Sequence, residues 1–555
     1  MTSSGTETQR RTLDFKMPIS TPVSTAGGSG AAPEVEQLQK VRHLVEVCIH
    51  QHQYDSAVFY ADKLTTLSGG DLDDMFLLAQ AYYFKKEYRR AVHFMKENFL
   101  IKSSIRFALL AAQCLAEMKD WEECLSVIGE DEKSAVEKFI PVETDDAEMS
   151  TIASIQLTRG KVYEALENRE RAVRWYKAAL STDRKCFEAL NCLVEKRMIS
   201  YEEQRDLLRS LESKSTDYAW LKPMYQLKLQ QHEEKTDSVD SLVKSLADDH
   251  GFKGNLDILA LQASQNYWKN RFQRAYDLSK EIVERDPFHH SVLPIYVCCL
   301  VELRMKTQLF FCAHHLVEAY PSKPISWFAV ASYYYLVRKY EMARRFFHKA
   351  IQLQQYFAPA WIGFGHSFAM KDESDQAMAA YRTATRLFRG SHVPLLCMGI
   401  EHLRTNSLGP ARQFLQQAQT ICPTDPLIFH EMGVVAYKSG EYADAATYFH
   451  KALSLTAGEA IESWEPTFVN LAHTYRKRGM FEKAIKYYEK ALSVAPKSPM
   501  IYTSLGFTHH LQGELDAAIQ YYHKALGIHP RDTITTDLLK LALKNAMQSF
   551  SLDDI

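Results

Sequence analysis

The sequence has no excess of either charge, and this removes the usual electrostatic basis for binding nucleic acids. Its 555 residues include 66 basic and 68 acidic side chains, for a formal net charge of -2. Strong nucleic-acid binders usually carry a basic excess or a basic stripe. We therefore expect no nucleic-acid partner.

The sequence also lacks long apolar runs. No stretch approaches the roughly 20 consecutive apolar residues that span a bilayer. The N-terminal MTSSGTETQRRTLDFK has no apolar centre of a signal peptide. The ten cysteines include no CxxC pair, the usual spacing of a structural zinc site. We expect no membrane partner, reduced thiols packed in a helical core, and a location in the nucleus and cytoplasm.

Motifs of catalysis and cofactor binding are missing as well. The chain has no GxxxxGK[ST], no GxGxxG and no HExxH. The string GHSFA at 365–369 looks like a nucleophile elbow around Ser367. Its place in the helical pattern puts Ser367 inside a helix, where the required strand-to-helix turn does not form. We predict no catalytic residue, no cofactor and no metal.

What the sequence does contain is helical periodicity with few breakers. Only 18 Pro and 22 Gly are spread over the chain, which favours helices. The Ser-, Gly- and Pro-rich start cannot bury enough apolar surface to order itself. In chain order we expect a disordered N-terminal tail at 1–34, an N-terminal repeat array at 35–195, an irregular helical segment at 196–255, a C-terminal repeat array at 256–535, and a C-terminal helix and tail at 536–555.

Internal repetition gives the strongest signal. Small residues recur every 34 residues, with one step of 39, at the position numbered 8 in the tetratricopeptide (TPR) pattern. Position 20 is alanine in seven of the same eight repeats, and position 32 is proline in five. Small residues at 8 and 20 allow two antiparallel helices to pack closely, and proline ends the second helix. The markers at position 8 are Ala263, Val297, Ala331, Gly365, Gly399, Gly433, Ala472 and Gly506.

The sequence therefore predicts an all-α TPR superhelical solenoid. Stacked helix pairs of this kind present a concave groove lined by the first helix of each pair, which suits a peptide or a helix. Aromatic and hydrogen-bonding side chains fall on groove positions of the C-terminal array. The candidate partner-binding residues are Phe328, Tyr335, His366, His430, Tyr437, Lys438, His473, Arg476 and His510.

Several strings go beyond the general TPR pattern: ERDPFHHSVLPIYVCCLVEL, YPSKPISWFAV, FAPAWIGFGHSFAM, DQAMAAYRTATRLF and PTDPLIFHEMGVVAYKSGEY, with YDSAVFYADKLTTLS near the N-terminus. Together they resemble one family, the cell-division-cycle-sixteen-type TPR subunit of the anaphase-promoting complex, or cyclosome. The likeness covers about residues 35–535.

The resemblance implies a non-catalytic scaffold of a cell-cycle ubiquitin ligase. It implies a homodimer formed through the N-terminal repeats and a small helical accessory subunit of the cell-division-cycle-twenty-six type in the C-terminal groove. Other TPR subunits would stack against it. Two alternatives stay open at this point. One is a TPR adaptor of a chaperone or transport assembly. The other is a glycosyltransferase-type enzyme with appended repeats, which would need an α/β domain for which no stretch remains.

Overall fold

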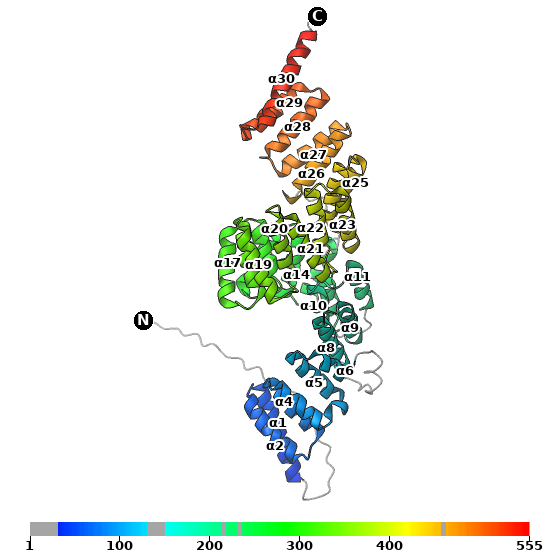
Figure 1. The fold of residues 1–555 in the computed structure, drawn as a ribbon, viewed down its shortest axis with the longest axis vertical. Helices are drawn as coiled ribbons and strands as arrows, with labels where there is room; N and C mark the ends of the chain where they lie inside the picture. Colours follow the sequence, from blue (N-terminus) through cyan, green and yellow to red (C-terminus); the bar gives the residue numbers. More distant parts are fainter. Residues whose placement is uncertain (1–31, 130–149, 212–217, 230–235, 457–461, 554–555) are drawn as a thin grey trace, which may run out of the picture. The chain divides into compact units, whose positions relative to one another are not determined.

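The computed structural model describes residues 32–129, 150–211, 218–229, 236–456 and 462–553 (Figure 1). All regular structure in these ranges is helical. The chain divides into two compact units, Met1–Val142 and Glu143–Ile555. Most of the predicted tail lies outside the described residues, although the first helix already begins at Ala32, before the expected end of the tail.

The first unit is a series of helix hairpins in which neighbouring helices pack in chain order. The sequence predicts a surface loop for the acidic segment at 129–150, and residues 130–149 of it lie outside the described residues. The helices are α1 (Ala32–His50), α2 (Tyr54–Leu67), α3 (Leu72–Phe84), α4 (Tyr88–Glu97), the 3-10 turn η1 (Leu100–Lys102), α5 (Ile105–Met118) and α6 (Trp121–Ile128).

The second unit continues the hairpins to the end of the described chain (Figure 1). Its early helices are α8 (Thr151–Ala165), α9 (Arg169–Thr182), α10 (Phe187–Glu195), α11 (Tyr201–Ser210), α12 (Leu221–Leu229) and α13 (Thr236–Asp248). The regular repeats run through α14 (Leu256–Trp268), α15 (Phe272–Arg285), α16 (Leu293–Glu302), α17 (Lys306–Ala319), α18 (Pro324–Leu336), α19 (Tyr340–Leu353), α20 (Ala358–Ala369), α21 (Ser374–Leu387), α22 (Val393–Arg404), α23 (Leu408–Ile421), α24 (Pro426–Lys438) and α25 (Tyr442–Leu455). The last elements are η2 (Glu462–Trp464), α26 (Glu465–Lys477), α27 (Phe481–Val494), α28 (Pro499–Gln512), α29 (Leu515–Ile528) and α30 (Thr533–Asp553).

The TPR register predicted from the sequence is confirmed by the packing inside each hairpin. A side chain on Gly433 would lie 2.6 Å from the ring of Phe449, and one on Gly506 would lie 2.8 Å from the ring of Tyr522. Both rings stand at position 24, so the second helix places its ring directly against the glycine of the first. Position 8 must be small there because the ring occupies the space of a side chain.

Where position 8 carries a larger side chain, position 24 carries a small one. Val45 is followed by Ala61 at position 24, and Val297 by Ala313, and all four side chains are almost fully buried. A larger residue at position 8 is thus compensated by a smaller one at position 24, so the two helices can pack at the same distance.

The link between the two helices of a hairpin bends through one residue with left-handed backbone conformation. Glycine supplies it at Gly440, Gly479 and Gly513, where φ is +82°, +74° and +89°. Other repeats place a residue with a side chain there, for example Arg338 with φ +65° and Asn406 with φ +58°. The hairpin geometry imposes this conformation even where the residue does not favour it.

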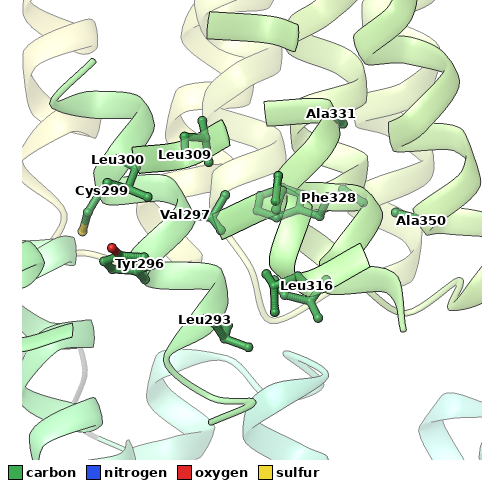
Figure 2. Close-up of a cluster of buried hydrophobic side chains, with 14 of the residues drawn as sticks. Leu293, Tyr296, Val297, Cys299, Leu300, Leu309, Leu316, Phe328, Ala331 and Ala350 are labelled. Carbon is green, nitrogen blue, oxygen red and sulfur yellow. The ribbon is translucent and has the colours of Figure 1, made fainter. Parts of the chain in front are cut away.

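A large apolar core joins the hairpins from α15 to α20. Val297, Leu309 and Phe328 meet inside it, and Figure 2 shows their side chains enclosed by the surrounding helices. This core fixes the first helices of three successive repeats relative to one another, so it sets the inner face on which the predicted groove residues lie.

Candidate partner-binding groove

The nine predicted groove residues all lie on first helices of hairpins in the second unit. They are distributed over α18, α20, α24, α26 and α28. The structure thus places them along one series of equivalent helices, although it does not give each of them an open surface.

Phe328 belongs to the core rather than to an open groove. Its side chain is 4% exposed, and its ring packs edge-on against Phe357 at 5.5 Å. Position 5 of this repeat is covered by the neighbouring repeats, so the expectation that Phe328 is open to a ligand does not hold in this structure. Tyr335 on the same helix is half-buried beside Tyr340, and burial raises its pKa to about 12.

Two histidines of the inner face are positioned by the ring that packs under position 8. His366 Nδ1 and the Tyr381 hydroxyl share a hydrogen bond of 2.8 Å, and His473 makes the same contact with Tyr488. Burial lowers the pKa of both imidazoles to about 4. Each imidazole is therefore neutral near pH 7, oriented by a tyrosine that is itself locked in the core.

His430 on α24 is also a neutral imidazole oriented by a hydrogen bond, but its partner is a threonine. Its Nδ1 shares a 2.8 Å hydrogen bond with the Thr467 hydroxyl of the next repeat, and burial lowers its pKa to about 4. For the three histidines, the structure gives Nε2 no hydrogen-bond partner among the residues that it describes. A neutral imidazole with one free nitrogen can donate to or accept from a peptide group of a bound chain.

Cationic and aromatic groups follow the histidines along these helices. The Arg476 guanidinium lies 4.9 Å from the Phe507 ring centroid. Lys438 donates to the Leu403 carbonyl of the preceding repeat at 3.1 Å. The Tyr437 ring packs against Tyr442, the first residue of α25, with centroids 5.5 Å apart.

His510 contacts the C-terminal helix of the chain itself. The Asn545 amide of α30 and His510 Nε2 lie 3.0 Å apart. The far end of the predicted groove is therefore bordered by α30, and at this repeat the first helix already has a partner within the chain.

Glu431, next to His430 on α24, is a further candidate for the groove that the sequence reasoning missed. Burial raises its pKa to about 7, with only a smaller opposing effect of Lys438. A half-buried carboxyl without an ion pair in the described part of the chain can form a hydrogen bond to a donor on a ligand. The signal was present as one charged residue inside the apolar run PLIFHEMGVVAY.

The string GHSFA at 365–369 does not have the geometry of a nucleophile elbow. Ser367 is fully buried in α20, and its hydroxyl donates to the Phe364 carbonyl at 2.6 Å. In the described ranges no three His, Cys, Asp or Glu side chains gather in a way that could hold a metal ion. All ten cysteines are free, and eight of them are buried, as expected for thiols of a helical core.

None of the described helices is both long enough and apolar enough to cross a membrane.

Comparison with family models places the chain among TPR proteins. Residues 426–497 and 465–531 match one tetratricopeptide-repeat model and 153–186 another. Residues 50–131 match the model described as anaphase-promoting complex, cyclosome, subunit 3.

Whole-chain comparisons are more specific. Anaphase-promoting complex subunit 6 of Arabidopsis thaliana is 41% identical over 93% of this chain and 98% of its own. The cell division cycle protein 16 homolog of Homo sapiens is 38% identical over 84% of this chain and 78% of its own. A crystal structure titled as the APC/C hetero-tetramer Cut9-Hcn1 aligns with a TM-score of 0.76 and 33% identity, covering 91% of this chain and 96% of that one. With its TPR hairpins and these full-length relatives, the chain belongs to the family of anaphase-promoting complex subunit 6 and cell division cycle protein 16.

Proposed function

We propose that this chain is a non-catalytic scaffold of the anaphase-promoting complex, which drives cell division through ubiquitin conjugation, and that it acts by holding other protein chains. The observation that carries the proposal is the row of neutral, tyrosine- or threonine-anchored histidines on the first helices of the second unit. Such groups recognise a polypeptide by hydrogen bonds without adding charge. The buried Ser367 supports the non-catalytic part of the proposal.

The occupant of the groove at 256–535 is a small helical accessory chain. The aligned crystal structure is titled as a hetero-tetramer in which a related chain, Cut9, is bound to a second protein, Hcn1. The groove of this chain supplies aromatic walls and polar groups in alternation, which suits an amphipathic helix or an extended peptide.

The groove is tested by comparing His473→Leu with His450→Leu in the full-length tagged chain. His473 is anchored by Tyr488 on α27. His450, on the second helix α25, shares a 2.7 Å hydrogen bond with the Tyr475 hydroxyl. Both substitutions remove one imidazole–tyrosine contact, but only His473 lies on a first helix.

We expect His473→Leu to reduce recovery of the small accessory chain from dividing cells by about tenfold, the effect of one lost hydrogen bond to a buried partner. His450→Leu should recover it at the level of the unsubstituted chain. Equal recovery by all three proteins in quantitative mass spectrometry would refute the groove assignment.

The homodimer is formed by the N-terminal repeats at 35–195. Large apolar side chains are exposed on the first unit, with Phe59 at 59% and Phe99 at 81%. Exposed apolar side chains of this size mark surfaces that become buried against a partner, and a second copy supplies a self-complementary one.

The dimer is tested with paired charge substitutions and light scattering at micromolar concentration. Phe59→Asp with Phe99→Asp should yield monomers. The matched control is Phe310→Asp with Phe311→Asp on α17, two exposed phenylalanines of the second unit, and this variant should stay dimeric. A monomeric unsubstituted chain would contradict the proposal.

The proposal has two further parts. The chain contacts other TPR subunits of the complex, and it is located in the nucleus and cytoplasm. The alternative, a TPR adaptor of a chaperone or transport machine, predicts different companions. Mass spectrometry of the tagged chain from dividing cells separates the two. Co-purified TPR, cullin-like and RING-type subunits support the scaffold, and chaperones or transport factors in their place support the adaptor.

A further inference from the structure

Distant segments of the second unit touch where the helix stack completes a turn. The Gly390 amide, just before α22, donates to the Arg197 carbonyl, just after α10, at 2.9 Å. The Ser463 hydroxyl donates to the Asn270 carbonyl at 3.3 Å, across 193 residues. The Gly390–Arg197 pair has the same separation in sequence. Two contacts with one offset show that successive turns of the stack lie against each other.

Three titratable side chains gather beside the first of these contacts. They are His392 at the start of α22, Cys422 at the end of α23 and Asp425 at the start of α24. His392 Nε2 lies 2.7 Å from Asp425 Oδ2, and the same imidazole forms a hydrogen bond with the Cys422 side chain. Since His392 is 3% exposed and Cys422 is 2% exposed, the surrounding helices hold this contact in place.

The imidazole of this cluster is charged. Burial works to lower the pKa of His392, but the hydrogen bonds to Asp425 and Cys422 outweigh it and raise the pKa to about 9. At pH 7 the sulfur of Cys422 is therefore in contact with a positive charge. Contact with a protonated histidine is one of the arrangements that make a cysteine thiol reactive, because the charge stabilises the thiolate.

The Cys422 thiol differs in this respect from a more exposed one. Burial works to raise the pKa of Cys422, but the hydrogen bond with His392 and its charge outweigh burial and lower the pKa below the ordinary value. Cys312 on α17 is only half-buried, yet burial raises its pKa to about 12. Because the thiolate is the nucleophile, the more deeply buried sulfur is the more reactive of the two.

The cluster borders a small space between the two turns. Its volume is about 10 Å³, the room of one water molecule. The wall includes His392 and Cys422 together with the half-buried side chains of Arg197, Tyr201 and Gln204. A reagent of about the size of water can reach the sulfur from here, and one oxygen atom added to the sulfur has a place to lie. A larger ligand does not fit.

We propose that Cys422 is a modification site, a thiol that hydrogen peroxide oxidises to a sulfenic acid with His392 as the proton donor. The thiolate sulfur attacks one oxygen of the peroxide, so that an S–O bond forms while the O–O bond breaks. The sulfur loses two electrons and the peroxide is reduced. The leaving hydroxide takes the proton of the His392 imidazolium and departs as water. The sulfenic acid is the first and reversible step of thiol oxidation.

This site is independent of the proposed partner groove. None of the nine candidate groove residues belongs to the cluster or lines the space beside it. The proposal therefore holds whatever chain the groove binds.

The test exposes the reduced full-length chain to hydrogen peroxide at pH 7 and follows Cys422 and Cys312 separately. Catalase stops the reaction, and the chain is unfolded in excess iodoacetamide and dimedone, which label thiols and sulfenic acids respectively. Mass spectrometry then measures the oxidised fraction of each cysteine over time. Labelling after unfolding makes the measurement independent of how well each label penetrates the folded chain.

The variant His392→Gln removes the imidazolium from the cluster. The matched control is His289→Gln, because His289 Nε2 lies 3.3 Å from Asp257 Oδ1 in another imidazole–carboxylate pair of the second unit. Both substitutions remove one such pair, but only His392 contacts Cys422.

We expect Cys422 to be oxidised at least about tenfold faster than Cys312, since its larger thiolate fraction outweighs the lower nucleophilicity of a weaker base. His392→Gln should slow the oxidation of Cys422 about tenfold and leave Cys312 unchanged. His289→Gln should match the unsubstituted chain. If His392→Gln does not fold, the comparison of the two cysteines in the unsubstituted chain still decides. Oxidation of Cys422 no faster than that of Cys312, or equal rates for Cys422 in both folded histidine variants, overturns the proposal.

Discussion

The two units build the same helix hairpin from different side chains. In the first unit positions 8 and 24 carry aliphatic pairs, such as Ala79 with Met95, whose side chains are fully buried. In the second unit most hairpins place an aromatic ring under a glycine or alanine, as Phe449 does under Gly433. One backbone geometry thus accepts either solution, provided that the shared volume is conserved.

The choice of side chain decides what each inner surface can do. The rings of Tyr381 and Tyr488 reach past the small residue and hold His366 and His473 by their hydroxyl groups. Methionine at position 24 offers no such hydroxyl, and the first unit instead exposes apolar residues such as Phe99. The difference predicts a polar ligand groove in one unit and an apolar interface on the other.

The largest expected effect concerns a buried carboxylate in the first unit. Asp74 is fully buried, and among the residues that the structure describes its ion pair is with Arg42, whose Nε lies 2.6 Å from Oδ1. Arg42→Met leaves this carboxylate buried without a partner, which costs about 3–5 kcal/mol. Chemical unfolding followed by hydrogen exchange should show the loss in the first unit.

Arg90→Met provides the control for this prediction. Arg90 is exposed and pairs with Glu87 at 3.1 Å, and exposed pairs contribute about 0–1 kcal/mol. Similar losses for Arg42→Met and Arg90→Met would mean that Asp74 finds another partner or water in solution.

Lowering the pH from 7 to 5 should reduce the stability mainly of the second unit. The folded pKa of about 4 for His366, His430 and His473 lies below the ordinary value of 6.5. Their contribution to stability is therefore complete above pH 6.5 and is lost as the pH falls toward 4, about 2 kcal/mol each at pH 5. Glu431, whose pKa is raised to about 7, instead stabilises the folded state as the pH falls. This gain offsets the loss from slightly more than one histidine, so the net loss of stability between pH 7 and pH 5 is about 3 kcal/mol.

Hydrogen exchange at pH 7 and pH 5, corrected for intrinsic rates, measures this difference between the units. The described histidines of the first unit are all exposed, so acid should not impose the same burial penalty there. They are His43, His50, His52 and His93. Equal loss of protection in both units would show that the buried histidines do not control the acid response.

The sequence predicted the repeat and its register because small residues and proline recur at fixed spacing, and that spacing follows from packing within one hairpin. It also placed the nine candidate groove residues on the first helices of their hairpins, where the structure has them. It did not predict that Phe328 is covered, because position 5 is buried or open depending on the size of side chains in the next repeat.

Two further features depend on more than one repeat. The raised pKa of Glu431 depends on how adjacent repeats exclude water from it. The contact of Gly390 with Arg197 depends on the rotation accumulated over a whole turn of the stack. A small error in the rotation for each repeat would separate these segments, and no local pattern in the sequence records that rotation.

Gly433→Ala should cost about 2 kcal/mol. The new methyl group would lie 2.6 Å from the Phe449 ring, so the ring or the helix must move. Overpacking of this kind costs about 1–3 kcal/mol, while alanine returns up to about 1 kcal/mol of helix propensity. The double variant Gly433→Ala with Phe449→Leu makes room for the methyl group and should recover part of the loss, measured by urea unfolding. No recovery would mean that the ring is not the obstacle.

The opposite exchange in the first unit should have the smallest effect. Ala79→Gly removes one buried methyl group beside Met95, and both side chains are fully buried. The loss is about 1 kcal/mol of helix propensity with a small cavity term, because the flexible methionine can move into the space. Urea unfolding should therefore rank Ala79→Gly below Gly433→Ala. The reverse order would show that the aliphatic hairpins are as tightly constrained as those built around a ring.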